Sequence, residues 1–223
     1  TTADGVYDVA NSCRFNDDDD PYMHKTPGGA GNVDTWTFSC WVKRGNLGIQ
    51  RIFSQGDHSD GNPMTFLGFQ ADNTIIFNNY QGADQVLVTN RVFRDVSAWY
   101  HIVIAVDTTN GSAGNRYRLY INGTEETSFS TDNNPDQNED TSVNSTNKFE
   151  LGSVGATTQN FDGYMAEVVL IDGTQYAASD FGEFNEDSPT IWQPKDVSGL
   201  TFGTNGFYLD FEASDNLGND ANG

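Results

Sequence analysis

Basic residues are scarce in this sequence. Its 223 residues include 11 lysines and arginines against 32 aspartates and glutamates, which gives a formal net charge of -21. A chain of this charge repels the phosphates of nucleic acids and anionic lipid headgroups, so nucleic-acid binding is excluded as its main function. The excess of carboxylates suits a protein that stays soluble in salty water, or one that binds divalent cations.

Long apolar runs are absent as well. No stretch approaches the roughly 18 apolar residues of a membrane-spanning helix, and the opening residues lack the basic and then apolar segments of a secretion signal. We therefore expect no membrane insertion. Residues 213–223 are polar and turn-like in composition, which indicates a piece of a longer polypeptide, and we expect residues 1–223 to be one domain of it.

Cysteine occurs only twice, at Cys13 and Cys40. Both lie in stretches that read as strands, where they could form a disulfide if those strands were neighbours. Burial as two free thiols explains them equally well, because free cysteine is often buried. The sequence leaves both possibilities open.

Short stretches with strand-like composition recur along the chain, separated by Gly, Asn, Asp and Pro. They span residues 11–15, 36–43, 50–54, 64–70, 74–79, 85–89, 99–107, 116–122, 149–153, 163–171 and 206–211. Only residues 176–183 read as helical. Aromatic residues make up 13% of the chain and can fill a core between two sheets although Leu and Ile are sparse. This pattern predicts an all-β fold, a two-sheet antiparallel jelly-roll sandwich.

Period-two alternation is clear in two places. In TWTFSCWVKRG, Trp36, Phe38, Cys40 and Val42 share one face, which we expect to be the core, and Trp41 lies on the opposite, mixed face. The stretches WYHIVIAVD and YRLYING predict a hairpin, and the final Asn-Gly pair, Asn122 and Gly123, predicts a tight turn. Residues 128–148 are nearly devoid of apolar side chains and are predicted to be a solvated loop.

Several of these blocks resemble one known family. In chain order, the blocks SCRFNDDDDPYM, TWTFSCWVKRG, WYHIVIAVD with YRLYING, and FDGYMAEVVLIDG resemble those of laminin-G-like domains of the concanavalin A-like lectin/glucanase superfamily. Together with GEF and TNGFYLDF, they are similar to the form of this domain found in marine bacteriophage tail and virion proteins. The resemblance implies a jelly roll whose rim loops bind glycans, with calcium in many relatives.

The sequence does not carry the carboxylates of a jelly-roll hydrolase. Such enzymes place alternating Glu and Asp on one strand, so that both point into one cleft. The nearest stretch, Glu183 to Asp187, has the wrong spacing and follows the predicted helix. A polysaccharide lyase needs a Tyr or His base together with an Arg, and no Arg-rich strand is present. Among the histidines, His101 is expected to be a packed residue of the hairpin, whereas His58 lies in a loop.

Calcium is the cofactor that the sequence suggests. Asp17, Asp18 and Asp19 follow the first strand, and clustered carboxylates on a turn suit this ion, although the spacing is not that of an EF-hand and a solvated acidic turn explains the run as well. The resemblance implies an acidic ligand just before the Glu-Val pair of the late strand, where this chain has Ala166. Asp210 is the predicted substitute.

Sugar binding needs planar hydrogen-bonding side chains beside an aromatic face. Asp57 and His58 on one loop, with Asn78 and Tyr80 at the end of another predicted strand, supply both kinds, although ordinary turn chemistry explains such residues too. We take these four as the candidate ligand-binding residues.

Taken together, these features predict a noncatalytic module that binds a glycan or host-surface polysaccharide, in a virion or an extracellular protein, with other virion subunits as further partners. Two alternatives stay open. One is a polysaccharide lyase or glycoside hydrolase with an unusual set of catalytic residues, and the other is a structural domain in virion assembly without a sugar ligand.

Overall fold

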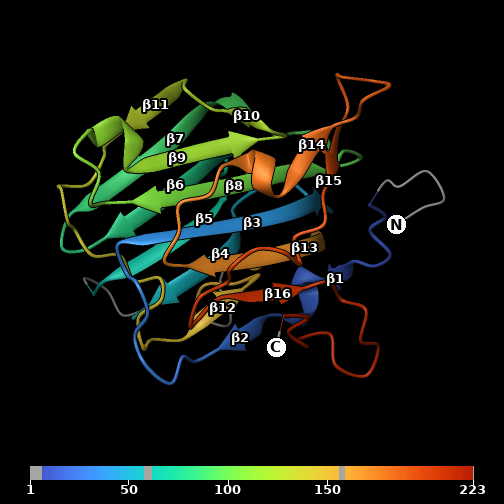
Figure 1. The fold of residues 1–223 in the computed structure, drawn as a ribbon, viewed down its shortest axis with the longest axis horizontal. Coiled ribbons are helices and arrows are strands. Elements are labelled where there is room, and N and C mark those ends of the chain that lie inside the picture. The colour runs from blue at the N-terminus through green and yellow to red at the C-terminus, as the bar shows by residue number, and fades with distance from the viewer. Residues whose placement is uncertain (1–6, 58–61, 156–158, 223) are drawn as a thin grey trace.

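The computed structural model describes residues 7–57, 62–155 and 159–222. The fold is the predicted all-β jelly roll, and the described residues form two large antiparallel sheets, A and B, of seven strands each (Figure 1). Within this part of the chain, no helix has the length and apolar character that a membrane span requires.

Sheet A runs in the order β1-β13-β3-β8-β9-β10, and β16 pairs with β13 beside β1. Its strands are β1 (Cys13–Phe15), β3 (Thr35–Arg44), β8 (Tyr100–Asp107), β9 (Tyr117–Ile121), β10 (Thr124–Glu125), β13 (Gly163–Asp172) and β16 (Phe207–Leu209).

Sheet B runs in the order β11-β7-β6-β5-β4-β12-β2. Its strands are β2 (Met23–Lys25), β4 (Gln50–Gly56), β5 (Met64–Phe69), β6 (Thr74–Tyr80), β7 (Asp84–Val92), β11 (Phe129–Asp132) and β12 (Phe149–Leu151). A small third sheet pairs β14 (Gly182–Phe184) with β15 (Trp192–Pro194), and three short 3-10 helices are η1 (Asp17–Asp19), η2 (Ala113–Asn115) and η3 (Ala178–Asp180).

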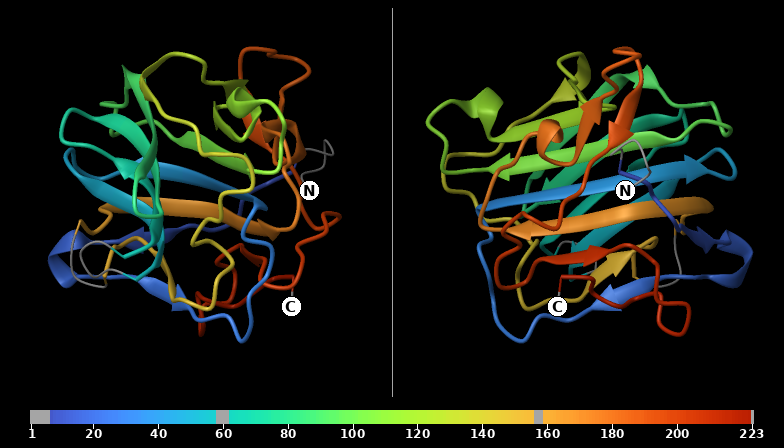
Figure 2. Two further views of the ribbon diagram at one scale, coloured as in Figure 1. Left: turned by 90° about the vertical axis from the view of Figure 1, so that its left-hand side faces the viewer. Right: turned by 45° about the vertical axis from the view of Figure 1, so that its right-hand side comes forward.

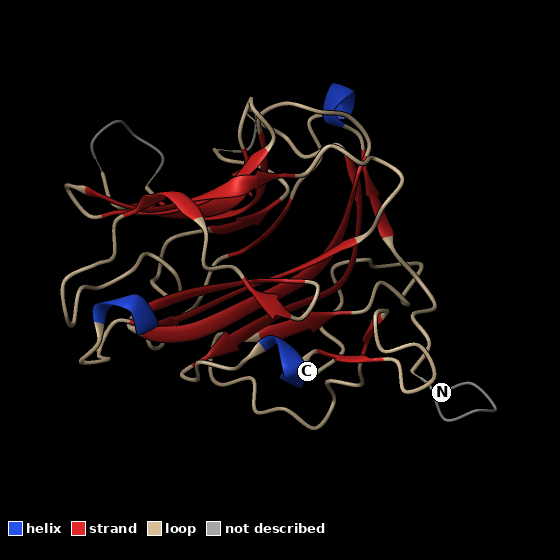
Figure 3. Ribbon diagram, turned by 90° about the horizontal axis from the view of Figure 1, so that it is seen from above, coloured by secondary structure: helices blue, strands red, loops and turns tan. Residues whose placement is uncertain are grey.

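The main core lies between the two sheets, which Figure 3 shows as two layers. The alternation predicted for β3 is confirmed, because Trp36, Phe38, Cys40 and Val42 are all fully buried in it. Burying each large apolar side chain contributes roughly 1.5–3 kcal/mol, so this face of β3 anchors the sandwich. Trp36 packs edge-on against Phe53 of sheet B, with ring centroids 6.2 Å apart.

The opposite face of sheet A is covered too. A second hydrophobic cluster joins side chains of β8, β9, β13 and β16 to the C-terminal segment. Its members are Val103, Ala105, Tyr120, Val169, Ile171, Ala178, Phe181, Val197, Phe202 and Tyr208. In the right-hand view of Figure 2, the orange segment that carries β14 and β15 lies in front of these strands. Sheet A is therefore buried on both faces over much of its area.

The predicted hairpin and its turn are confirmed. β8 pairs with β9 in antiparallel register, with Val103 opposite Tyr120. Asn122 and Gly123 connect β9 to β10 with φ values of 48° and 77°, the positive values that tight two-residue turns require.

Two local predictions are wrong. Residues 176–183 form no α-helix, because η3 is a single 3-10 turn and the chain enters β14 at Gly182, where it pairs with β15. Residues 128–148 are not wholly solvated, since β11 pairs with β7 and Thr141–Asn144 are buried. The hydroxyl of Thr141 accepts a hydrogen bond of 2.9 Å from Nε1 of Trp36, so this polar segment closes one end of the core.

Both cysteines are buried free thiols. Cys13 lies on β1 and Cys40 on β3, and these strands pair with opposite edges of β13. Burial raises the pKa of both thiols, which disfavours the reactive thiolate.

We therefore expect thiol titration of the unreduced protein to find two reactive groups in denaturant. The native protein should react only slowly, because both sulfur atoms are buried. No titratable thiol in the unfolded, unreduced protein would mean that the two cysteines pair.

Candidate functional site

An aromatic cavity of about 330 Å³ opens over the outer face of sheet A, beneath the β14–β15 hairpin. We call it the aromatic groove, and its lining residues are Trp41, Arg91, Trp99, Ile121, Asn122, Thr124, Phe184, Thr190 and Trp192. Three of the four tryptophans of the chain line this single cavity. Such a density of indole rings at a partly exposed site requires an explanation beyond core packing.

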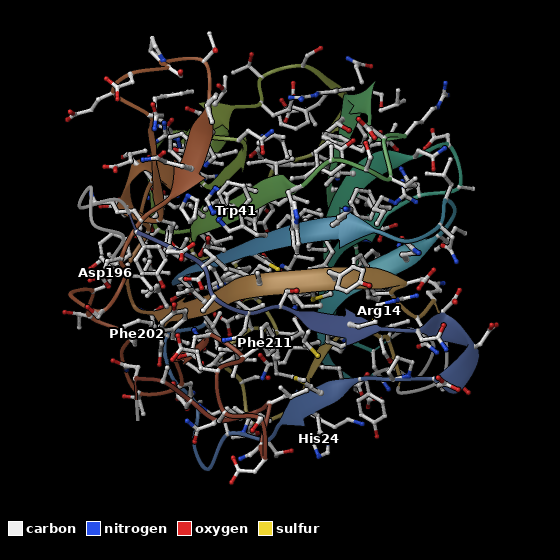
Figure 4. The ribbon with its side chains drawn as sticks, turned by 90° about the vertical axis from the view of Figure 1, so that its right-hand side faces the viewer. Arg14, His24, Trp41, Asp196, Phe202 and Phe211 are labelled. Carbon is white, nitrogen blue, oxygen red and sulfur yellow. The ribbon has the colours of Figure 1, made fainter. Side chains whose placement is uncertain are left out.

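Trp41 reaches the groove from β3, and Trp99 reaches it from the position directly before the neighbouring strand β8. Trp41 lies on the face of β3 opposite the core residues, as the alternation predicts. Trp99 immediately precedes β8, the strand that pairs with β3, and is 36% exposed. Figure 4 views the molecule from the side at which β3 ends and labels Trp41 there. Trp41 is therefore held within sheet A, and Trp99 lies beside it at the start of β8.

The β14–β15 hairpin supplies the opposite wall. Phe184 pairs with Trp192 across this hairpin, and their rings meet at 70° with centroids 4.9 Å apart. The ring of Trp192 lies directly over Gly123, where an added Cβ would come within 2.3 Å of it. A glycine is therefore needed at position 123 for two reasons: it adopts the positive φ of the turn, and its lack of a side chain lets the β14–β15 hairpin approach closely.

His101 connects the two walls. It is 1% exposed and stacks on Trp41 and Trp192, with ring centroids 4.9 Å and 5.9 Å away. Its Nδ1 accepts a hydrogen bond of 3.0 Å from Nε1 of Trp192, so the proton resides on Nε2, which lies 2.8 Å from the hydroxyl of Ser39. Burial lowers the pKa of His101 to about 3, which keeps the ring neutral near pH 7. The prediction that it is a packed residue is confirmed.

Polar groups are placed among these rings. Arg91 forms no ion pair with any described residue, and its guanidinium carbon lies 5.1 Å from the centroid of the Phe93 ring. The indole N–H of Trp41 is buried and has no acceptor among the described residues. An unpaired buried donor costs stability, and such groups mark places where a ligand or another function compensates.

Comparison with known families assigns the chain. Residues 17–178 match the family described as the concanavalin A-like lectin/glucanases superfamily. The chain belongs to this superfamily. A comparison with curated protein sequences gave no match.

Solved structures of this fold superpose on the chain at low sequence identity. Domains LG4-5 of the mouse laminin α1 chain give a TM-score of 0.53 at 12% identity, covering 83% of this chain and 46% of that chain. A protein of Bacteroides ovatus proposed to bind carbohydrate gives 0.50 at 16%, covering 86% and 50%. The native heptameric SAP-like pentraxin of Limulus polyphemus gives 0.50 at 14%, covering 77% and 80%. This chain spans about half the length of the laminin and Bacteroides chains.

Of the ligand-binding residues predicted from the sequence, the three that the structure describes lie on or next to sheet B, away from the aromatic groove. Asp57 follows the last residue of β4, Gly56, and Tyr80 is the last residue of β6. Both Gly56 and Tyr80 pair with Met64 of β5, so Asp57 and Tyr80 lie at the same end of the sheet. Asn78 is 9% exposed and donates a hydrogen bond of 2.9 Å to Asp84. His58 lies outside the described residues. The structure thus gathers the described three at one rim, and a role in binding stays a prediction.

The acidic residues predicted to hold calcium are not gathered in one place. Asp17, Asp18 and Asp19 form η1 after β1, beyond the point where β1 pairs with Gly163 of β13. Asp210 follows β16, which pairs with β13 near Val168. At about 3.3 Å per residue, Val168 lies roughly 15 Å along β13 from Gly163. In the described ranges, no group of three His, Cys, Asp or Glu side chains could hold a metal ion.

Two of the three carboxylates of η1 accept hydrogen bonds from neighbouring amides. Asn46 donates to Asp17 at 3.0 Å, and Asn16 donates to Asp19 at 2.6 Å. This arrangement does not fit a preformed calcium cage, which needs several oxygen ligands converging on one point.

Calcium binding at these residues stays a prediction that melting curves test. If Asp17–Asp19 or Asp210 hold the ion, EDTA should lower the melting temperature and added calcium should restore it, because a ligand of the folded state stabilises that state. An unchanged curve at saturating EDTA would identify η1 as a solvated acidic turn.

Proposed function

We propose that this chain is a noncatalytic carbohydrate-binding module and that the aromatic groove holds the sugar. The observation that carries the proposal is the convergence of Trp41, Trp99 and Trp192 on one cavity with polar side chains between them. The apolar C–H face of a sugar ring stacks on an indole, while amides, hydroxyls and guanidinium groups bond its hydroxyls.

The composition of the groove favours binding over hydrolysis. None of the described residues that line it is an Asp, Glu or His, so no general acid or base faces a bound glycosidic bond. His101, which lies behind the indoles, is neutral and fully engaged with Trp192 and Ser39. The proposed carbohydrate-binding role of the Bacteroides ovatus relative supports the same reading.

We further propose that the module belongs to a virion or extracellular protein, of the marine bacteriophage tail type, and that it recognises a cell-surface polysaccharide. The support is the order of sequence blocks, from SCRFNDDDDPYM to TNGFYLDF, together with the net charge of -21, which suits solubility in salty water. Other virion subunits would be its protein partners. Repeated copies on one particle would strengthen a weak affinity through multivalency.

A glycan array combined with product assays tests this function. We expect binding of a polysaccharide with an affinity on the order of millimolar to tens of micromolar per site, typical of a shallow groove. We expect neither new reducing ends nor unsaturated products.

The two alternatives predict different results. Products that accumulate from a polysaccharide, and that are lost on changing one polar residue, would identify an enzyme. Absence of binding to every glycan, combined with assembly into particles, would identify a structural virion domain.

A further inference from the structure

A second cavity of about 320 Å³ adjoins the aromatic groove on the outer face of sheet A. We call it the N-terminal cavity, and its lining residues are Val9, Ala10, Asn11, Ser12, Trp41, Trp99, Ala166 and Pro194. It shares Trp41 and Trp99 with the groove, and β15 contributes Trp192 to one cavity and Pro194 to the other. The two cavities therefore lie on either side of one pair of indoles.

The wall that encloses the N-terminal cavity is anchored at both of its ends. On one side, the hydroxyl of Tyr7 lies 3.0 Å from a carboxylate oxygen of Glu167 and 2.8 Å from the hydroxyl of Tyr208. Tyr208 donates its own hydrogen bond of 2.5 Å to the same oxygen of Glu167. On the other side, the segment continues into β1, which pairs with β13. Residues 8–12 are thus held against sheet A as a formed wall.

Glu167 is itself placed for this contact by the sheet. It lies in a β-bulge of β13, where the register with β3 shifts between Ala166 and Val169, and its φ of 50° departs from that of a regular strand. A bulge redirects a side chain that regular alternation would not present. Glu167 is 6% exposed, and its carboxylate accepts hydrogen bonds from the hydroxyls of Tyr7 and Tyr208, which makes this contact specific.

Resting on the proposed function, we infer that the two cavities form one extended site for an unbranched, uncharged oligosaccharide, whose successive rings lie on both sides of Trp41 and Trp99. Each cavity is at the small end of the range for ligand pockets, about 300–1,000 Å³, and a chain can pass from one to the other along the shared indoles. A site for a single terminal sugar would not need the second cavity.

The charge of the lining selects the class of glycan. Among the described residues that line the two cavities, only Arg91 carries a charge. The formal net charge of the whole chain is -21. A polyuronate or heavily sulfated chain would be repelled by this field, and one guanidinium group cannot compensate for several anions. Arg91 serves a neutral chain as a donor to its hydroxyls.

Calorimetric titration of the whole chain with oligosaccharides of increasing length tests the inference. The probes are cello-, xylo-, manno- and laminari-oligosaccharides of one to about six units, with alginate oligosaccharides as the charged series. In at least one neutral series, the affinity should rise about tenfold between two and four units, a gain of the size that a further stacked ring provides, and then level off.

A variant and its matched control test whether the gain in affinity with length comes from the N-terminal cavity. Ser12→Trp places a large side chain in the N-terminal cavity from an exposed backbone position, and it should remove the gain with length while leaving the disaccharide affinity unchanged. Ser112→Trp, at an exposed position in the loop before η2, is the matched control and should behave as wild type. Melting curves of both variants establish that they are folded.

The possible results separate the two proposals. Three results would overturn the extended neutral site and leave the carbohydrate-binding function standing. They are an affinity that does not depend on length, a length dependence that Ser12→Trp does not change, and tighter binding of alginate than of every neutral series. No binding to any of the five series or to any glycan of the array would overturn both.

Discussion

We expect Trp99→Ala to lower the affinity for polysaccharide about tenfold or more while the protein stays folded. Trp99 lines both cavities of sheet A, so its removal takes away the face on which the proposed site would stack neighbouring sugar rings. Aromatic stacking contributes about 0.5–1.5 kcal/mol beyond the area it buries, and the lost contact area adds to this. Because Trp99 is 36% exposed and lies outside the main core, the melting temperature should change little.

Tyr164→Ala is the matched control for this variant. Tyr164 is an aromatic residue of β13 with 41% exposure that lines neither cavity, so its loss should leave affinity unchanged. Affinity electrophoresis in polysaccharide gels measures both variants side by side. If Tyr80→Ala abolishes binding and Trp99→Ala does not, the site is the sheet B rim predicted from the sequence and not the aromatic groove.

We expect the second large effect on acidification, through His101. Burial places the pKa of this imidazole at about 3 in the folded protein, against about 6.5 in the unfolded chain. As the pH falls, the unfolded chain therefore takes up the proton first. The stability that His101 provides is fully present above pH 6.5 and is lost progressively toward pH 3, by an upper bound of about 5 kcal/mol.

Glu167 acts in the opposite direction at low pH, because burial raises the pKa of its carboxyl and the folded protein binds that proton more readily. Comparing a His101 variant with the wild type separates the contribution of His101 to the pH dependence from that of Glu167. Urea unfolding of His101→Gln between pH 7 and pH 4 should give a shallower decline in the free energy of unfolding than wild type, although the variant starts from lower stability. His24→Gln, at an exposed position of β2, should keep the wild-type slope, and equal slopes for all three proteins would contradict the assignment.

The scaffold was predictable because its signals are local. Alternation placed Trp36 to Val42 in the core and Trp41 on the other face, and the Asn-Gly pair at Asn122 predicted a turn with positive φ. Each of these depends on a few consecutive residues and on the period of two that a strand imposes. The same reasoning failed for residues 176–183, because their pairing with β15 depends on a partner strand that has no alternation long enough to recognise.

The aromatic groove was not predictable in the same way. Trp192 is brought to His101 and Gly123 by the packing of the C-terminal segment over sheet A, and no spacing in the sequence encodes that contact. Trp41 on the mixed face was the one available signal, since an indole placed away from the core needs a partner or a ligand. The acidic run that begins at Asp17 is the more conspicuous signal in the sequence, yet Asp17 and Asp19 accept hydrogen bonds from neighbouring asparagines.

Because the C-terminal segment covers sheet A, it also determines when the aromatic groove forms during synthesis of the chain. Trp41 and Trp99 leave the ribosome long before β14 and β15 are made, and they line a cavity only after that hairpin has closed over Gly123. Because such distant contacts form late and a chain folds as it is synthesised, a nascent chain that extends only through β13 has its indoles on an open sheet. The aromatic groove is therefore completed late, after the strands that carry Trp41 and the chain around Trp99 have been synthesised.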